Sequence, residues 1–182
     1  YFQAAMPGTY PANAATGTAI SNGAKWGAVV GQFTGSIGSA APQDFHFDAK
    51  ATARVWRWVV TGVVPTNMCA PAKFCQPDVA ELMFHEAGAA AGVYMLNNGT
   101  ASSSLVIDSS GGQTPENMPW TAVDGDLRYV DYKYGWDAVW ALGPPDAPQK
   151  ASWLVFDFGR DVSLDGIRLY SHGDGIHDVV SH

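Results

Sequence analysis

The chain is short of charge, and above all of positive charge. Only 15% of its 182 residues are charged, with 10 Lys and Arg against 17 Asp and Glu, so the formal net charge is −7. A negative protein repels nucleic-acid phosphates and anionic lipid headgroups at long range. We therefore expect no nucleic-acid partner, and a phospholipid membrane is disfavoured as a docking surface.

Long apolar runs are also missing. No stretch approaches the roughly 18–20 consecutive apolar residues that span a bilayer, and the first residues lack the charged and apolar regions of a signal peptide. We expect a soluble chain. Tyr1 to Gln3 look like the remnant of a protease-site tag and Ala4 to Met6 like vector sequence, so residues 1–15 are interpreted as a tag remnant and N-terminal extension that stands outside the fold.

Cysteine is scarce, with Cys69 and Cys75 as the only two. Two thiols without a neighbouring His make a poor zinc site, so a small disulfide loop formed in an oxidising compartment is favoured over two free thiols. Asn98 begins the only N-glycosylation sequon, Asn98-Gly99-Thr100. Together these features predict a secreted protein, extracellular or at the cell surface.

Patterns typical of catalysis are absent. The five His and the acidic residues form no metal-ligand spacing, and there is no Gly-x-Ser-x-Gly elbow and no phosphate loop. Asp157, Asp161 and Asp165 are spaced as turn and strand-end residues, and nothing pairs them as a general acid and base. We expect that the protein is not an enzyme.

Hydrophobic residues, glycine and proline are plentiful. They amount to 47% hydrophobic residues with 20 Gly and 11 Pro, a profile of frequent turns that favours an all-β protein. Val, aromatic and alternating residues predict strands over 26–30, 45–47, 51–64, 152–158 and 166–170. Residues 51–64 are expected to form a central strand. The segment 78–95 is ambiguous, because its Ala, Glu, Leu and Met content favours a helix whereas Val79, Leu82 and Phe84 could serve in a strand.

Alternation assigns faces to the last two strands. In Ser152 to Phe158, one face carries Leu154, Phe156 and Phe158 and the other carries Trp153, Val155 and Asp157. From Gly166 to Tyr170, Ile167 and Leu169 are expected to point inward. Trp26, Trp56, Trp58 and Trp153 are expected in the core or on a sheet face, and Arg54 and Arg57 in internal ion pairs or carbonyl caps. Several short strands joined by loops predict a β-sandwich.

Particular segments resemble the discoidin family, also called the coagulation factor type C or galactose-binding-like domain. Those similar to its first half are TASSS (100–104), PWTAVDGD (119–126), Trp136, SWLVFDFG (152–159) and GIRLYSHGDGIHDV (166–179). Those similar to its second half are SNGAKWGAVVGQF (21–33), ATARVWRWVVTGV (51–63) and DVAELMFHE (78–86). The family's second half therefore comes first in this chain.

The resemblance implies a galactose-binding-like jelly-roll β-sandwich whose halves are in permuted order. Residues 16–182 would form one domain, in which 16–95 correspond to the family's C-terminal half and 96–182 to its N-terminal half. Two isolated half-sandwiches would expose sheet faces and unpaired edges, so the halves are expected to close on each other, within one chain or between two. The resemblance also predicts a strand at Asp78 to Phe84, against the helix propensity.

The resemblance further implies a structural calcium site. Asp124 and Glu81 would give side-chain oxygens, and the remaining ligands would be mainly carbonyls of Thr121, Asp126, Tyr129 and Ala80. Tyr129 departs from the family, which often has Thr there. The alternative is that Asp124 only caps a turn and that Glu81 pairs with a cation such as Arg128.

For ligand binding the family uses loops at one end of the sandwich. The corresponding candidates are Trp136, Trp140, His172 and Asp174, although each Trp could instead be a buried plug. His177-Asp178 is interpreted as a structural strand end. The expected function is non-catalytic adhesion or recognition of a glycan or cell-surface glycoprotein. The alternative is a structural module that docks a protein partner.

Overall fold

The computed structural model describes most of the strands and several connections. The described residues are 1–10, 23–34, 41–60, 78–95, 105–109, 119–125, 127, 140–141 and 152–171. None of the helices within these ranges has the length and apolar character needed to cross a membrane.

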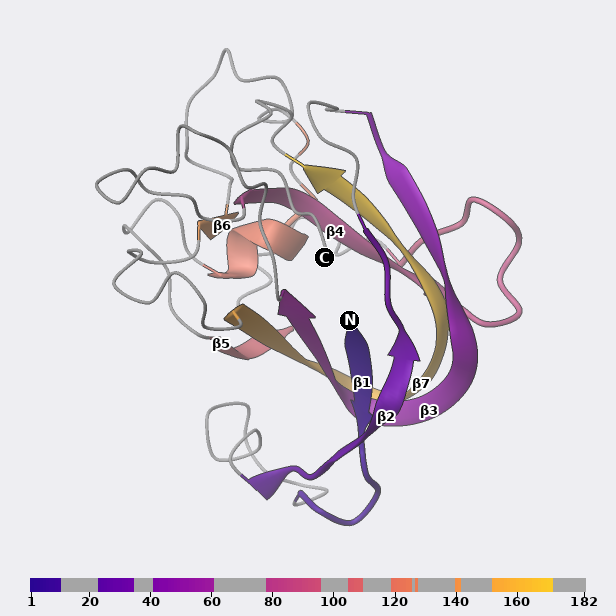
Figure 1. The fold of residues 1–182 in the computed structure, drawn as a ribbon, viewed down its shortest axis with the longest axis vertical. Helices are drawn as coiled ribbons and strands as arrows, with labels where there is room; N and C mark the ends of the chain where they lie inside the picture. The colour runs from indigo at the N-terminus through magenta and orange to yellow at the C-terminus, as the bar shows by residue number, and fades with distance from the viewer. Residues whose placement is uncertain are drawn as a thin grey trace.

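The described residues form one antiparallel sheet with a short 3-10 helix beside it (Figure 1). The elements are β1 (Phe2–Ala5), β2 (Trp26–Gly31), β3 (Gln43–Val60), β4 (Asp78–Glu86), β5 (Val106–Ser109), η3 (Pro119–Val123), β6 (Trp140–Ala141) and β7 (Ser152–Ser171). The seven strands follow the order β2-β1-β3-β7-β4-β6, and β5 pairs with β7 off this path. The prediction of an all-β protein is confirmed.

Strands β3 and β7 are the two long central strands of the sheet. They pair over nearly their whole length, with Trp58 opposite Leu154, Val55 opposite Asp157 and Asp44 opposite Arg168. Because β3 comes from residues 16–95 and β7 from residues 96–182, the two parts of the sequence share one sheet within a single chain. The central position predicted for residues 51–64 is confirmed as far as Val60, where the description of β3 ends.

Both long strands bend together, as the right-hand side of Figure 1 shows. The β3–β7 register shifts between His46 and Ala51, which divides the sheet into two arms. The first arm contains β1, β2, β5 and the adjoining parts of β3 and β7, and the second arm contains β4 and the remaining parts. Gly166 lies at this bend, where an added Cβ would stand 2.7 Å from the carbonyl oxygen of Phe45. Only glycine fits such a close backbone approach without a shift.

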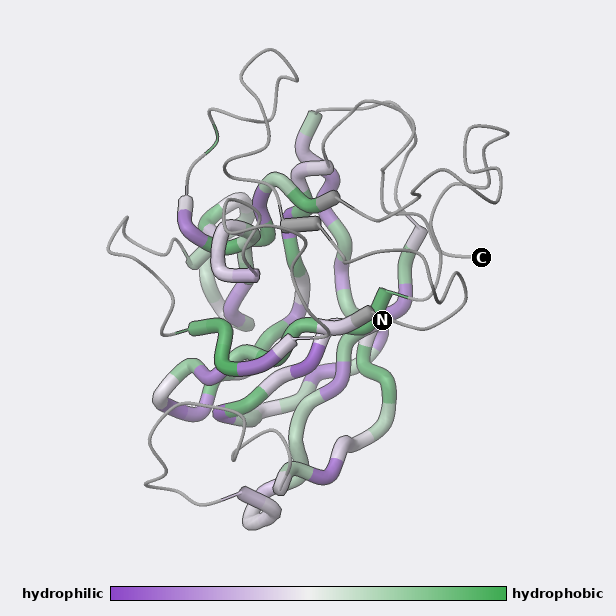
Figure 2. The backbone as a smooth tube through the Cα atoms, turned by 90° about the vertical axis from the view of Figure 1, so that its left-hand side faces the viewer, coloured by the Kyte–Doolittle hydropathy of each residue, from purple (hydrophilic) through white to green (hydrophobic). Residues whose placement is uncertain are grey.

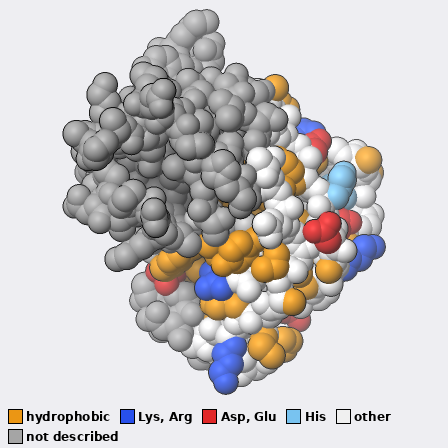
Figure 3. Space-filling view, in the orientation of Figure 1, with side chains coloured by type: hydrophobic (Ala, Val, Ile, Leu, Met, Phe, Trp, Pro, Cys, Tyr) orange, Lys and Arg blue, Asp and Glu red, His pale blue; other side chains and the backbone are white. Residues whose placement is uncertain are grey.

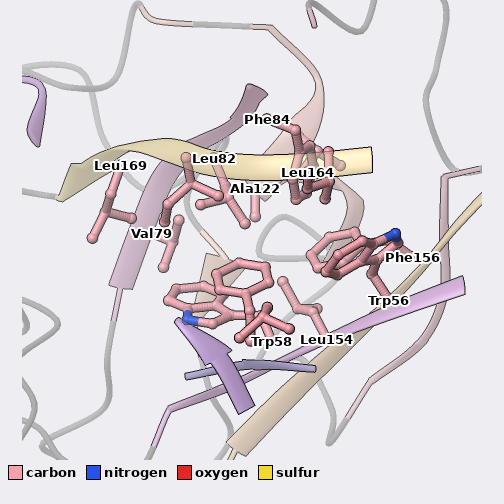
Figure 4. Packing of buried hydrophobic residues seen from close by; sticks show 14 of the residues in the cluster. Trp56, Trp58, Val79, Leu82, Phe84, Ala122, Leu154, Phe156, Leu164 and Leu169 are labelled. Carbon is pink, nitrogen blue, oxygen red and sulfur yellow. The ribbon is translucent and has the colours of Figure 1, made fainter. Parts of the chain in front are cut away.

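Hydrophobic and hydrophilic residues alternate along parts of the strands (Figure 2), and the buried residues form two clusters, one on an inner and one on an outer face of the sheet. The inner face holds the main core, in which Trp56 and Leu154 of the first arm join Phe84 and Leu169 of the second (Figure 4). Val155 instead belongs to a separate outer cluster with Ala5, Val55 and Ile107. The faces predicted for Leu154, Phe156 and Phe158 against Trp153 and Val155 are therefore confirmed, as is the burial of Ile167 and Leu169.

Residues 1–5 are part of the fold, which corrects the expectation that they stand outside it. β1 lies between β2 and β3, and the Phe2 side chain is fully buried against Phe33, Phe47 and Trp58. A phenylalanine and alanines are compatible with a buried strand whatever their origin. A resemblance to tag sequence therefore gives no information about whether a segment packs.

Strands β4 and β7 test two further expectations from the sequence. Asp78–Glu86 is a strand, as the family resemblance predicts and against the helix propensity, because β4 pairs with β7 and buries Val79, Leu82 and Phe84. Where two separate strands were expected at 152–158 and 166–170, β7 is continuous from Ser152 to Ser171. Asp161 and Asp165 consequently lie within a strand, because β3 pairs with β7 on both sides of the bend.

Candidate functional site

The candidate site is built from β4 and η3, which are far apart in the sequence. Ala122 and Val123 of η3 are buried in the main core with Val79 and Leu82 of β4 (Figure 4). This apolar packing holds the C-terminal end of η3 beside β4. It brings Glu81 and the Asp124-Gly125 turn together, although more than 40 residues separate them.

Glu81 is the central polar group of this site. Glu81 is almost completely buried, with 2% of the residue exposed. Its Oε2 accepts a hydrogen bond from the backbone N–H of Gly125 at 3.0 Å. Gly125 has a φ of +80°, a conformation that glycine adopts without strain. A buried carboxylate is costly unless donors or cations surround it, so Glu81 depends on this turn for part of its compensation.

The backbone of β4 is irregular next to Glu81. The β4–β7 register shifts between Val79 and Glu81, with Val79 opposite Ser171 and Glu81 opposite Tyr170. A register shift of this kind disturbs the ladder locally and re-aims a side chain. Ala80, at the shift, is fully buried.

Of the predicted calcium ligands, four lie in the described part of the chain. Ala80 and Glu81 are on β4, Thr121 is buried on η3, and Asp124 follows η3 and is partly exposed. Asp126 and Tyr129 lie outside the described residues, and so does Arg128, the alternative partner of Glu81. Within the described ranges, no three His, Cys, Asp or Glu side chains gather closely enough to hold a metal ion. A calcium site on these residues would therefore need backbone carbonyls or hydroxyls as well.

Aromatic residues flank the same site. Trp120 on η3 is 37% exposed, which sequence reasoning did not single out because PWTAVDGD was matched as a whole. The backbone of Trp140 is in β6, opposite Val79, two positions from Glu81. Trp136, His172 and Asp174 lie outside the described residues, as do Cys69, Cys75, Asn98 and the pair His177-Asp178.

A second polar group lies on the outer face of the second arm. Arg168 donates from Nε and Nη2 to Asp44 at 2.6 and 2.8 Å and stands 4.4 Å from the ring centre of Tyr94. The hydrogen bonds from Arg168 hold the pKa of Asp44 below its ordinary value. Beside it, His85 Nδ1 lies 2.5 Å from Asp165 Oδ1, and this contact raises the pKa of His85.

Among the described residues of the first arm, Arg54 and Asp157 form an internal ion pair. Arg54 donates from Nε and Nη2 to the two oxygens of Asp157, both at 2.6 Å, and the Asp157 side chain is almost fully buried. The hydrogen bonds to Asp157 raise the pKa of Arg54. The internal role predicted for Arg54 is confirmed, and it explains why a carboxylate is tolerated inside β7.

Comparison with known proteins identifies no relative: no family model, no curated protein and no solved structure matches this chain.

Proposed function

We propose that the chain is a discoidin-type, galactose-binding-like jelly roll with its halves in permuted order, and that it recognises a glycan without catalysis. The observation that carries the proposal is the contact between Glu81 and Gly125. Glu81 belongs to DVAELMFHE and Gly125 to PWTAVDGD, which resemble opposite halves of the family pattern, and the two residues meet across more than 40 residues of sequence. The pairing of β3 with β7 supports the permuted order, because it unites the same two halves.

The residues at the site suit a structural calcium ion. Calcium takes six to eight oxygen ligands from carboxylates, carbonyls and hydroxyls. Glu81 and Asp124 would supply carboxylate oxygens, and the irregular backbone at Ala80 and the turn after Thr121 would supply further oxygens. Bound calcium would supply positive charge that offsets the burial of Glu81 and ties η3 to β4.

Glycan binding is assigned to the same end of the sheet. Exposed aromatic rings provide flat apolar faces for sugar rings, and Trp120 on η3, four residues before Asp124, is partly exposed. Trp140, which begins β6 beside β4, and Trp136 are the other proposed platforms, with His172 and Asp174 as polar partners. An extracellular location, with a Cys69–Cys75 disulfide and a glycan on Asn98, completes the proposal.

Calcium binding is tested by thermal unfolding with added CaCl₂ or with EDTA. A ligand present at 100 times its dissociation constant stabilises a protein by about 2.7 kcal/mol, so calcium should raise the unfolding temperature of the wild-type chain. Glu81→Gln should abolish this rise. Glu86→Gln is the matched control, since Glu86 lies on the same strand but is partly exposed and pairs with Arg160. An unfolding temperature indifferent to calcium would refute the metal site.

Sugar binding is tested by calorimetric titration with galactose-type sugars and by a glycan array. Sugar binding should weaken in each of the variants Trp120→Ala, Trp136→Ala and Trp140→Ala. The control is Val93→Ala, at an exposed position after the C-terminal end of β4, which should bind sugar as the wild type does. If no sugar binds and the array is blank, the recognition proposal fails. Binding of a purified protein partner through the same residues would then favour the alternative module.

A further inference from the structure

Four arginines fall within the described residues, and three of them pair with carboxylates through two hydrogen bonds. Arg54 pairs with Asp157, Arg160 with Glu86 and Arg168 with Asp44. Arg57 differs, because within the described part of the chain it has no acidic partner. Acidic residues outnumber basic ones by 17 to 10, so the difference does not come from a shortage of carboxylates.

Neutral groups hold the Arg57 guanidinium in place. Nη2 donates to Oε1 of Gln3, whose own amide nitrogen donates to the carbonyl of Gly27 at 2.8 Å. The Arg57 Cζ atom stands 4.4 Å from the ring centre of Trp26, a cation–π distance. The guanidinium plane is therefore fixed before any ligand arrives, which reduces the ordering cost of binding.

The arrangement leaves the cation incompletely compensated. Nε of Arg57 is buried and has no hydrogen-bond acceptor, whereas in Arg54 and Arg168 the same atom bonds an aspartate. Burial also lowers the pKa of Arg57 from its ordinary value, because the loss of hydration of the charged form outweighs its charge interaction with Tyr1. A buried donor without a partner is uncommon in folded proteins and calls for a physical reason.

The surroundings of Arg57 are aromatic and apolar. Arg57 lies on the outer face of β3, opposite Gln3 of β1 and Val155 of β7. Trp153 is two register positions away on the same face, opposite Val59, and is partly exposed. Val29, opposite Gln3 on β2, is 44% exposed. The face shown in Figure 3 has hydrophobic side chains gathered over β1 and β2, with basic side chains among and below them, while histidine and acidic side chains gather on the right-hand side.

We propose that Arg57, held by Gln3 and Trp26, receives the carboxylate of an acidic saccharide on the outer face of the first arm. The guanidinium binds the carboxylate through charge-assisted hydrogen bonds, and the indole of Trp153 lies beside the sugar ring. A peptide is the less suitable ligand, since peptides are usually bound at sheet edges or in grooves. Arg57 lies between two paired strands, where no edge is open.

This site is independent of the one at Glu81. Arg57 belongs to β3 and its contacts come from β1 and β2, whereas Glu81 belongs to β4 and its contact comes from the turn after η3. A failure of the calcium or galactose experiments therefore does not affect the proposal for Arg57. A failure of the Arg57 experiments likewise does not affect the proposal for Glu81.

The test is a titration of the whole chain with sodium glucuronate. Binding is monitored by calorimetry and by the NMR signals of the Trp153 indole N–H and the Arg57 Nε–H. Glucose and the methyl ester of glucuronic acid are the matched probes, because they keep the ring and lack the anion. Glucuronate should bind and shift both signals, and the two neutral probes should bind at least about tenfold more weakly, as expected when a charged hydrogen-bond partner is lost.

Variants separate the role of the guanidinium from that of charge in general. Arg57→Gln should weaken glucuronate binding about tenfold or more, and Arg160→Gln, which removes an exposed arginine elsewhere, should leave it unchanged. Arg57→Lys keeps the positive charge but lacks the planar guanidinium group, so it should also bind glucuronate more weakly than the wild type. It replaces Arg57→Gln as the test variant if Arg57→Gln does not fold. Equal binding of acid and ester would overturn the proposal. So would binding of an oligoglutamate peptide at Trp153 in the absence of any glucuronate binding.

Discussion

The two arms of the bent sheet are made from the same pair of strands, yet their outer faces differ. In the second arm, the outer face carries bonded charges: Asp44 with Arg168, and His85 with Asp165. In the first arm it carries the Arg54–Asp157 pair and Arg57 together with an apolar cluster around Val55 and Val155, bordered by Trp26 and Trp153. Paired charges need no further cover, whereas an apolar face with partly exposed rings is the kind of surface that binds other molecules.

The largest effect is expected where the arms meet on the inner face. Phe84 of the second arm packs edge-on against Phe156 and contacts Phe2 of the first arm. Phe84→Ala should lower the free energy of unfolding by about 3–5 kcal/mol, because it removes buried contacts and leaves a cavity. Urea denaturation measures this loss. Val93→Ala, at a 56% exposed site, should change it by less than about 0.5 kcal/mol. Equal effects would mean that the arms do not share one core.

The ion pairs of the two arms should differ in importance. Asp157→Asn should cost about 3 kcal/mol, because it leaves Arg54 beside a neutral group in a buried pair. Asp44→Asn should cost less than about 1 kcal/mol, because the Asp44–Arg168 pair is more exposed. Chemical denaturation of the two variants and the wild type makes the comparison. If the two variants lose similar amounts of unfolding free energy, burial does not explain a difference in importance between the two ion pairs.

The bend itself can be tested at Gly166. Gly166→Ala places a methyl group 2.7 Å from the carbonyl oxygen of Phe45, so backbone must shift. We expect a loss of about 1–3 kcal/mol, typical of overpacking. Asp161→Ala, at an exposed position of the same strand, should be nearly neutral. An equally mild effect at Gly166 would show that the bend does not need the close approach of β3 and β7.

The smallest effect is the pH dependence that His85 of the second arm contributes. The contact with Asp165 raises the pKa of His85 above its ordinary 6.5, and His85 Nε2 also lies 3.3 Å from the carbonyl oxygen of Ala90. Only the protonated ring donates from both nitrogens. Its stabilising contribution should be complete below about pH 6.5 and be lost as pH rises through the folded-state pKa.

His85→Gln should remove this dependence. Tyr94 packs on the His85 ring and Asp44 adds a further negative charge, so both belong to the environment that sets the pKa. Unfolding free energies measured from pH 5.5 to 8.5 should converge for wild type and variant at high pH. An NMR titration of the His85 ring that gives a pKa at or below 6.5 would contradict the expectation.

Much of the fold could be predicted from local patterns. Alternation placed Leu154 and Phe156 on the opposite face from Val155, because successive side chains of a strand point to opposite faces. Propensity failed at Asp78–Glu86, where pairing with β7 and burial of Leu82 outweighed a weak helix preference. The strand at Phe2–Ala5 was missed because its sequence resembles a tag and vector remnant, and four residues carry too little pattern to reveal burial.

The candidate site was predictable only in pieces. Motif matching named Glu81 and Asp124 separately, and nothing in the sequence alone measures the distance between them. The positions of Trp120 at the surface and of Arg57 against Trp26 were not predicted, because exposure and ring contacts depend on packing between distant segments.

By itself, the sequence determined the shortage of charge, the all-β class and the inward and outward faces of its strands, because these depend on composition and on the two-residue period of a strand. The tertiary structure decided which halves pair, where the sheet bends and which of the described arginines has no carboxylate partner among the described residues. Those outcomes depend on contacts between residues that lie 40 to more than 100 positions apart, and no local pattern encodes them.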